Sequence, residues 1–188
     1  EHPMSEKAVS PIELGAVKRV CDATSKVLDE VIGRARTVTA GGKGIDDHQV
    51  HAERVAYAAT EARAARDLLA YAEECAAAGQ GSSVLNDMAA LVAAEVAARI
   101  AGQCDQWSGD YAVPAGLLDA TLGSADVKPL IRAGTDEARA RAIGRDVIAQ
   151  RGVNNSYLED ILAMTRDSVR QFARSEVAPH AERVHRHD

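Results

Sequence analysis

The chain has 188 residues, which is enough for one ordinary domain with a buried core, and its formal net charge at pH 7 is -6. Hydrophobic residues make up 46% of the sequence and aromatic residues only 3%, so the core must come mainly from Ala, Val, Leu and Ile, which favours closely packed helices. The acidic balance and the lack of a clustered Lys/Arg stripe argue against a nucleic-acid surface, and the apolar runs are too short to predict a membrane span.

Two helices are predicted in the first half of the chain. Apolar residues recur at helical spacing over residues 11–36, and Pro11 is suited to the first turn of this helix. A glycine-rich break follows, and Asp46 with Gln49 three residues later is typical of a capping pair. We therefore expect a long Ala-rich helix over residues 47–78.

A third long helix is predicted after the sequence "GQGSS". Ser82 or Ser83 is suited to cap it, and its apolar face should end near Gln106. The sequence "WSGDYAVP" that follows is typical of a loop. Residues 115–130 carry a weaker pattern, which predicts one or two short helices.

The next predicted helix runs to about residue 150. Thr135 can cap its start, and Asp136 and Glu137 then lie in a first turn where the helix dipole favours negative charge. This segment is of interest because "AGT", residues 133–135, looks like a fragment of an enzyme motif as well as a helix start.

A last helix is predicted near the end of the sequence. Ser156 and Glu159 form the pattern of a capping box, and Pro179 should end or bend the helix. No stretch of the sequence alternates in the manner of a strand. The predicted fold class is therefore all-α, an up-down helical bundle of four or five main helices.

Three stretches of the predicted bundle carry motifs of a known family, in the family's order: "GKGIDDHQVHAERVAYAATEARAARDLLAYA", "AALVAAEVAARIAGQCDQWSGDYAV" and "IRAGTDEARARAIGRDVI". The first is similar to a Phe-Gly-Lys turn that leads to a Gln and an Ala-rich helix. The second ends like a Gln-x-x-Gly-Gly-Tyr-Gly loop, and the third is similar to a Glu-Gly-Thr segment. Together they resemble the C-terminal helical domain of the acyl-CoA dehydrogenase family, flavoenzymes that oxidise acyl-CoA thioesters.

The resemblance implies four vestigial cofactor-binding candidates, Gln106 and Gly109 in the loop and Gly134 and Thr135 in the third stretch. For Thr135 a helix cap is the favoured interpretation, because Ser and Thr caps are common. In many members of the family the residue before this glycine is a Glu that removes the α-proton of the thioester. Here it is Ala133, whose methyl group accepts no proton, so no catalytic residue is predicted.

Other positions of the resemblance also depart from the family's pattern. Gly41 stands where a Phe is expected, and Asp110 stands at the second Gly, where its charge would be unfavourable beside a flavin pyrophosphate. Trp107 lies in the same loop and is interpreted as a packing residue. Some relatives carry the base on another helix, and Glu73 or Glu74 could supply one only by pointing into a cavity. The pattern indicates a bundle that kept its packing and lost its catalysis.

A fourth stretch, "YLEDILAMTRDSVRQFARSEVAPHAERVHRHD", resembles the opening helix of an acyl-CoA dehydrogenase, which in the family precedes the C-terminal bundle. The reversed order predicts a larger parent protein in which a degenerate bundle is fused ahead of a second dehydrogenase unit. The expected divisions are a flexible N-terminus over residues 1–10, the degenerate bundle over 11–152, and a linker with the first helix of a truncated N-terminal domain over 153–188.

The sequence predicts no metal site. His48 and His51 share a helix face, but no third ligand with suitable spacing accompanies them. The three cysteines are an odd number at wide spacings, which fits reduced thiols in a core: Cys21, Cys75 and Cys104. Because no signal-peptide pattern is present either, the predicted location is cytoplasmic.

These observations predict the N-terminal structural or oligomerisation bundle of an FAD-dependent acyl-CoA dehydrogenase of fatty acid metabolism. FAD is expected in the parent protein, and this chain alone is expected neither to bind it nor to catalyse. The expected partners are the remainder of the dehydrogenase or further copies joined through the bundle. Two alternatives stay open, a non-catalytic subunit that shares a flavin site in a hetero-oligomer and a stand-alone helical interaction domain.

Overall fold

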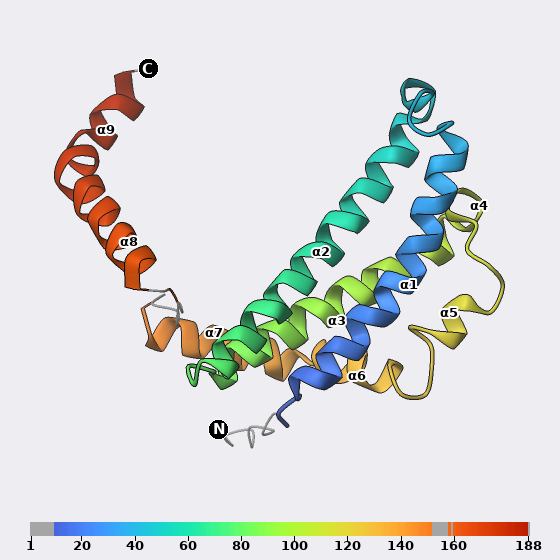
Figure 1. The fold of residues 1–188 in the computed structure, drawn as a ribbon, viewed down its shortest axis with the longest axis horizontal. Coiled ribbons are helices and arrows are strands. Elements are labelled where there is room, and N and C mark those ends of the chain that lie inside the picture. The colour runs from blue at the N-terminus through green and yellow to red at the C-terminus, as the bar shows by residue number, and fades with distance from the viewer. Residues whose placement is uncertain (1–9, 152–157, 159, 188) are drawn as a thin grey trace, which may run out of the picture. The chain divides into compact units, whose positions relative to one another are not determined.

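The computed structural model describes residues 10–151, 158 and 160–187, and the chain divides into two compact units, Glu1–Asn154 and Asn155–Asp188 (Figure 1). The helices of the first unit are α1 (Leu14–Val38), α2 (Gln49–Ala77), α3 (Ser83–Gln106), α4 (Ser108–Tyr111), α5 (Leu117–Ala120), α6 (Lys128–Gly134) and α7 (Glu137–Ala149). The described residues include no strand, which confirms the all-α fold class.

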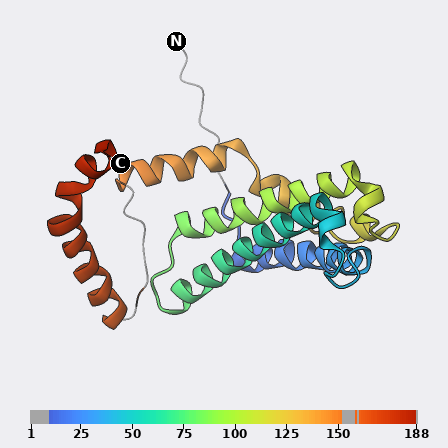
Figure 2. The same ribbon diagram turned by 90° about the horizontal axis from the view of Figure 1, so that it is seen from above.

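The core of the first unit lies between the three long helices α1, α2 and α3, which pack against one another in pairs (Figures 1 and 2). On α1 the buried stripe includes Val20 and Val27, seven residues apart. On α3 the buried face includes alanines at every fourth position, with Ala89, Ala93 and Ala97 at most 2% exposed. Such small side chains let helix axes approach closely, so an aromatic-poor sequence still makes a tight bundle.

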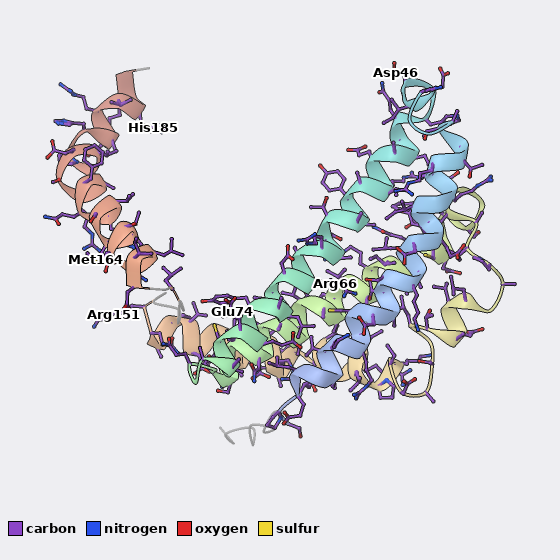
Figure 3. The ribbon with its side chains drawn as sticks, viewed as in Figure 1. Asp46, Arg66, Glu74, Arg151, Met164 and His185 are labelled. Carbon is purple, nitrogen blue, oxygen red and sulfur yellow. The ribbon has the colours of Figure 1, made fainter. Side chains whose placement is uncertain are left out.

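Polar side chains also join the long helices. Arg66 of α2 reaches α1, where its Nη2 donates to Ser25 Oγ at 2.7 Å and to Asp22 Oδ1 at 3.2 Å (Figure 3). Arg99 of α3 forms an ion pair with Glu61 of α2. Both pairs are partly exposed, so they contribute modestly to stability and mainly favour one alignment of the helices.

The first two predicted helix starts were wrong. Pro11 lies before α1, whose N-cap is Glu13 in an extended conformation. Asp46 does not cap α2, because it lies inside a 3-10 turn, Ile45–His48, that leads directly into this helix. A preceding 3-10 turn offers its own carbonyl groups to the first N–H groups of a helix, so no side-chain cap is needed there.

The start of α3 is as predicted, and the segment after it is not. The Oγ of Ser82 accepts a hydrogen bond from the Leu85 N–H at 3.1 Å, which confirms this serine as the cap, and the helix ends at Gln106 as expected. The predicted loop "WSGDYAVP" instead contains the one-turn helix α4, which is followed by Ala112 in a left-handed conformation with φ 45°. The buried side chain of Tyr111 anchors this turn to the bundle.

The second unit is a helical segment that consists of α8 (Asp160–Phe172), a π turn (Ala173–Val177) and α9 (Ala178–His187). Proline lacks an N–H group, and its ring clashes with the carbonyl four residues earlier in a regular helix. The wider π turn before Pro179 removes that conflict and produces the predicted bend. The capping box at Ser156 and Glu159 lies outside the described residues.

The surface of the second unit is apolar along one side of α8. Ile161, Met164 and Phe172 are 71%, 71% and 59% exposed, and Met164 is labelled in Figure 3. Among the helices that the structure describes, none has the length and apolar character of a membrane span.

Candidate functional site

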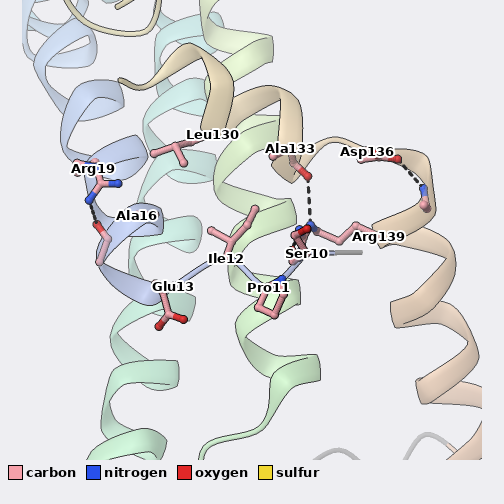
Figure 4. Close-up of a pocket in the computed structure, with 12 residues that line it drawn as sticks. Ser10, Pro11, Ile12, Glu13, Ala16, Arg19, Leu130, Ala133, Asp136 and Arg139 are labelled. Atoms are coloured by element: carbon pink, nitrogen blue, oxygen red, sulfur yellow. Dashed lines mark hydrogen bonds between the residues drawn. The ribbon is translucent and has the colours of Figure 1, made fainter. Parts of the chain in front are cut away.

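The segment Ala133–Gly134–Thr135 lies at the junction of α6 and α7 (Figure 4). Ala133 and Thr135 are exposed and Gly134 is buried. α6 packs on α3 and also contacts α1, which holds the junction against the bundle. The site that the sequence singles out is therefore a real structural feature, at the end of a helix and beside the core.

Gly134 is the contact point between α6 and α3. A Cβ atom at this position would lie 2.4 Å from the Ala94 Cβ and 2.9 Å from the Ala90 carbonyl oxygen, distances that neither backbone nor methyl group can tolerate. Only glycine lets the end of α6 come this close to α3. The structure thus gives Gly134 a packing role that is independent of any cofactor.

The predicted role of Thr135 as the cap of α7 was wrong. Thr135 closes the preceding helix instead, since its N–H and its Oγ1 both donate to the Ile131 carbonyl at 3.0 Å. The cap of α7 is Asp136, whose Oδ1 accepts a hydrogen bond from the Ala138 N–H at 3.0 Å. Because α6 runs to Gly134, its C-terminal carbonyl groups accept the hydrogen bond from the Thr135 hydroxyl. The next residue, Asp136, then caps α7.

A cavity of about 660 Å³ lies beside Ala133. Its lining is mainly apolar: Pro11, Ile12, Gly15, Ala16, Leu130, Ala133 and Ala138, with Ser10, Glu13, Arg19, Asp136 and Arg139 as polar members (Figure 4). Asp136 is engaged as a helix cap, and Glu13 stands at the start of α1. The relocated bases considered from the sequence, Glu73 and Glu74, are exposed on α2 and do not line this cavity.

Arg139 is a buried cation next to this junction, and sequence analysis missed it. Its side chain is 2% exposed, forms an ion pair with Asp87 of α3, and donates from Nε to the Ala133 carbonyl at 3.2 Å. Its Nη2 donates to the Ser10 carbonyl at 2.7 Å. A buried guanidinium is tolerated when its charge is compensated and its donors are used, as they are here.

The other two candidates are Gln106, at the C-terminal end of α3, and Gly109, in α4, and both are exposed. Gly134 contacts α3 at Ala94, twelve residues before Gln106, which corresponds to about 18 Å along the helix at 1.5 Å per residue. The structure therefore does not bring the four candidates together. They form two separate pairs joined by one helix.

At the α4 end the loop is occupied by the chain's own charges. The Arg54 Nη1 forms an ion pair with Asp110 Oδ2 at 3.1 Å, and the Arg54 guanidinium carbon lies 4.1 Å from the centre of the Trp107 ring. This cation–π contact confirms Trp107 as a packing residue. Sequence analysis missed Arg54, since its partner is 56 residues away and no local pattern links them.

Tyr111 lies beneath this cluster with its ring edge-on to Trp107 at 5.7 Å and to His51 at 6.3 Å. Burial raises the pKa of Tyr111 to about 12, and burial also raises the pKa of the neighbouring Cys104 thiol to about 11. Within the described residues the Tyr111 hydroxyl and the His51 Nε2 have no hydrogen-bond partner. The Tyr111 phenol is therefore neutral and packs among the surrounding side chains. Its unsatisfied hydroxyl costs free energy, which the packing of the bundle offsets.

The donor set at α4 does not suit the diphosphate of a flavin nucleotide. Asp110 presents a carboxylate at the loop, and the nearby guanidinium of Arg54 is already paired with it. At the junction of α6 and α7, Ala133, which has only a methyl side chain, lines the cavity. We therefore derive no cofactor chemistry from these residues.

His48 and His51 lie on either side of the point where the 3-10 turn leads into α2. His48 is the last residue of the 3-10 turn and His51 faces Tyr111. Among the residues that the structure describes, no three His, Cys, Asp or Glu side chains are grouped so that they could hold a metal ion.

The fold and the junction agree with the result of comparing the chain with known proteins. Residues 19–148 match the family model described as acyl-CoA dehydrogenase, C-terminal domain. Neither a curated protein nor a solved structure matches the chain closely enough to be compared with it. The matched region runs from α1 to the end of α7 and includes both ends of the candidate site, and the chain therefore belongs to the acyl-CoA dehydrogenase family through the C-terminal helical domain of that family.

Proposed function

We propose that this chain supplies a structural, oligomer-forming bundle to an FAD-dependent acyl-CoA dehydrogenase of fatty acid metabolism and does not itself carry out the oxidation. The observation that carries the proposal is the contrast between Ala133 and Gly134. The position that resembles the family's base holds a methyl group, whereas the adjacent glycine is retained in a contact with Ala90 and Ala94 that needs it for packing.

The charges of the α4 end support the same proposal. A site for an anionic cofactor gains from unpaired cations and backbone N–H groups. Here Arg54 is neutralised by Asp110 and stacked on Trp107, which stabilises the bundle and leaves little positive potential for a ligand. A bundle that serves assembly is expected to keep its packing and to pair its charges within the chain.

The exposed side of α2 is the surface through which we expect the bundle to associate. Val50 and Tyr57 lie seven residues apart on one face of this helix and are 61% and 64% exposed. Aromatic and aliphatic side chains exposed together are enriched at protein interfaces. The partner is then either another copy of the bundle or the remainder of a dehydrogenase.

Analytical ultracentrifugation of the full chain tests this surface. We expect an oligomer, and Tyr57→Glu combined with Val50→Glu should shift it to monomer by placing charges in an apolar contact. Ile148→Glu is the matched control, because Ile148 is 78% exposed on α7, away from this face, and its substitution should leave the oligomer unchanged. A monomer that does not associate with an acyl-CoA dehydrogenase either would overturn the proposal.

A further inference from the structure

The residues that precede α1 lie against the junction of α6 and α7. Residues 10–13 line the same cavity as Leu130, Ala133 and Asp136 (Figure 4). Their backbone is extended at Glu13, which ends the segment and starts α1. Residues 10–13, named here the N-terminal strap, thus form one wall of the cavity, and the ends of α6 and α7 form another.

The strap is held by a side chain that comes from the far end of the bundle sequence. Arg139 Nη2 donates to the Ser10 carbonyl at 2.7 Å, and the two residues are 129 positions apart in the chain. The same guanidinium pairs with Asp87 through Nη1 and bonds the Ala133 carbonyl through Nε. One planar group therefore joins the strap, α3, the end of α6 and α7.

The Arg139 guanidinium is not a simple surface ion pair, and its geometry suits a group that holds the strap in place. The Arg139 side chain is 2% exposed, so each of its donors must find a protein acceptor. Asp87 compensates the charge and fixes the plane of the guanidinium, which aims Nη2 at the strap. A lysine could pair with Asp87 but has no rigid fork that reaches two acceptors in different directions.

We propose that Arg139, positioned by Asp87, latches the N-terminal strap in place as one wall of the cavity beside Ala133, and that the strap moves away and the cavity widens when this latch is released. The strap is then a movable wall of a partly open, mainly apolar cavity rather than a fixed part of the core. The proposal concerns access to the cavity and stands whether or not the bundle forms the oligomers proposed above.

A thiol on the strap gives a direct readout of latching. Ile12 lines the cavity and is partly buried, whereas the native thiols of Cys21, Cys75 and Cys104 are at most 5% exposed. The rate at which a thiol-specific reagent modifies the Ile12→Cys variant, located by mass spectrometry of its peptide, therefore reports release of the strap. Modification of Cys104 in the same sample reports opening of the whole bundle.

The latch is then changed in this background. Arg139→Met and Arg139→Lys should each increase the modification rate of the introduced strap thiol at least about tenfold, with no change at Cys104; the lysine variant keeps the charge beside Asp87 and guards against misfolding of the methionine variant. Arg141→Met, two residues along α7 and paired with Glu137 at the surface, is the matched control and should leave the rate unchanged.

Three results would overturn the latch. The modification rate of the strap thiol could be equal with Arg139 intact, in the Arg139→Met and Arg139→Lys variants, and in the Arg141→Met control. It could already equal that of an unprotected thiol while Arg139 is intact. In either latch variant the strap thiol and Cys104 could accelerate by the same factor, which would show that Arg139 holds the bundle as a whole and that the strap has no separate motion.

Discussion

Two neighbouring residues at the end of α6 separate the chemistry of the family from its packing. Ala133 faces a cavity and is exposed, so the bundle tolerates any small side chain there. Gly134 meets α3 so closely that a methyl group would overlap Ala94. A carboxylate can therefore be lost at the first position without cost to the fold, while the glycine at the second is kept by sterics alone.

Replacement of Gly134 measures this contact. Gly134→Ala is expected to lower the free energy of unfolding by about 1–3 kcal/mol, because a new methyl group must displace α6 from α3. Gly144→Ala is the control within α7, where a new Cβ meets nothing within 4 Å, and it should raise stability by roughly 0.5–1 kcal/mol through helix propensity. Urea unfolding of both variants checks the signs, and equal effects would refute the packing role.

The buried phenol of Tyr111 makes stability depend on pH in the alkaline range. Its pKa rises from about 10 in the unfolded chain to about 12 in the fold, so the neutral form is the folded form. The stabilisation is complete below about pH 10 and is lost as the pH rises toward about 12. Tyr111→Phe should remove the phenol's part of this loss, up to about pH 12, and leave the part due to the buried Cys104 thiol, whose pKa is raised to about 11. Tyr57→Phe, at an exposed position, should keep both parts. Trp107 fluorescence during unfolding gives the measurement, and an unchanged alkaline limb in Tyr111→Phe would contradict it.

At the scale of elements, the break between α6 and α7 shows why local patterns place helix ends imprecisely. Thr135 and Asp136 are both good capping residues, and the sequence alone favoured the first. The choice is made by the packing of α6 on α3 through Gly134, which extends α6 until Thr135 closes it. The cap therefore follows from a tertiary contact that no local motif records.

Two substitutions of Asp136 separate the contribution of its capping oxygen to stability from the contribution of its charge. Asp136→Ala is expected to destabilise the chain by about 1 kcal/mol, since the Ala138 N–H loses its acceptor. Asp136→Asn retains a capping oxygen and should differ from the native chain by only a few tenths of a kcal/mol. Thermal unfolding followed by circular dichroism compares the two, and identical losses would show that the cap is not what Asp136 contributes.

The long helices were predictable because each is defined by a stripe that repeats along its own sequence, such as Val20 and Val27 on α1. Their bounds were predicted to within a few residues, as was the Ser82 cap. The candidate site was less predictable, because its decisive contacts join distant residues. The pairs Arg54 with Asp110 and Arg139 with Asp87 are separated by 56 and 52 positions, and neither has a spacing that helical periodicity would reveal.

At the scale of the whole molecule, the matched domain supplies a scaffold whose two candidate regions lie at different parts of α3. Gln106 and Gly109 stand beside a paired cation, and Gly134 and Thr135 serve the junction of α6 and α7. Each of the four residues has a position that packing, capping or exposure explains. We therefore propose that the bundle is an acyl-CoA dehydrogenase domain used for assembly, with flavin chemistry supplied by other parts of the parent enzyme.

The most direct test of this claim combines flavin binding with turnover. The full chain is dialysed against FAD, its bound flavin is measured by absorbance after removal of free ligand, and the same sample is assayed with acyl-CoA thioesters and an artificial electron acceptor. We expect no bound flavin and no oxidation, both in the native chain and after Ala133→Glu restores a carboxylate. Stoichiometric FAD, or oxidation of any acyl-CoA above the protein-free rate, would contradict the proposal.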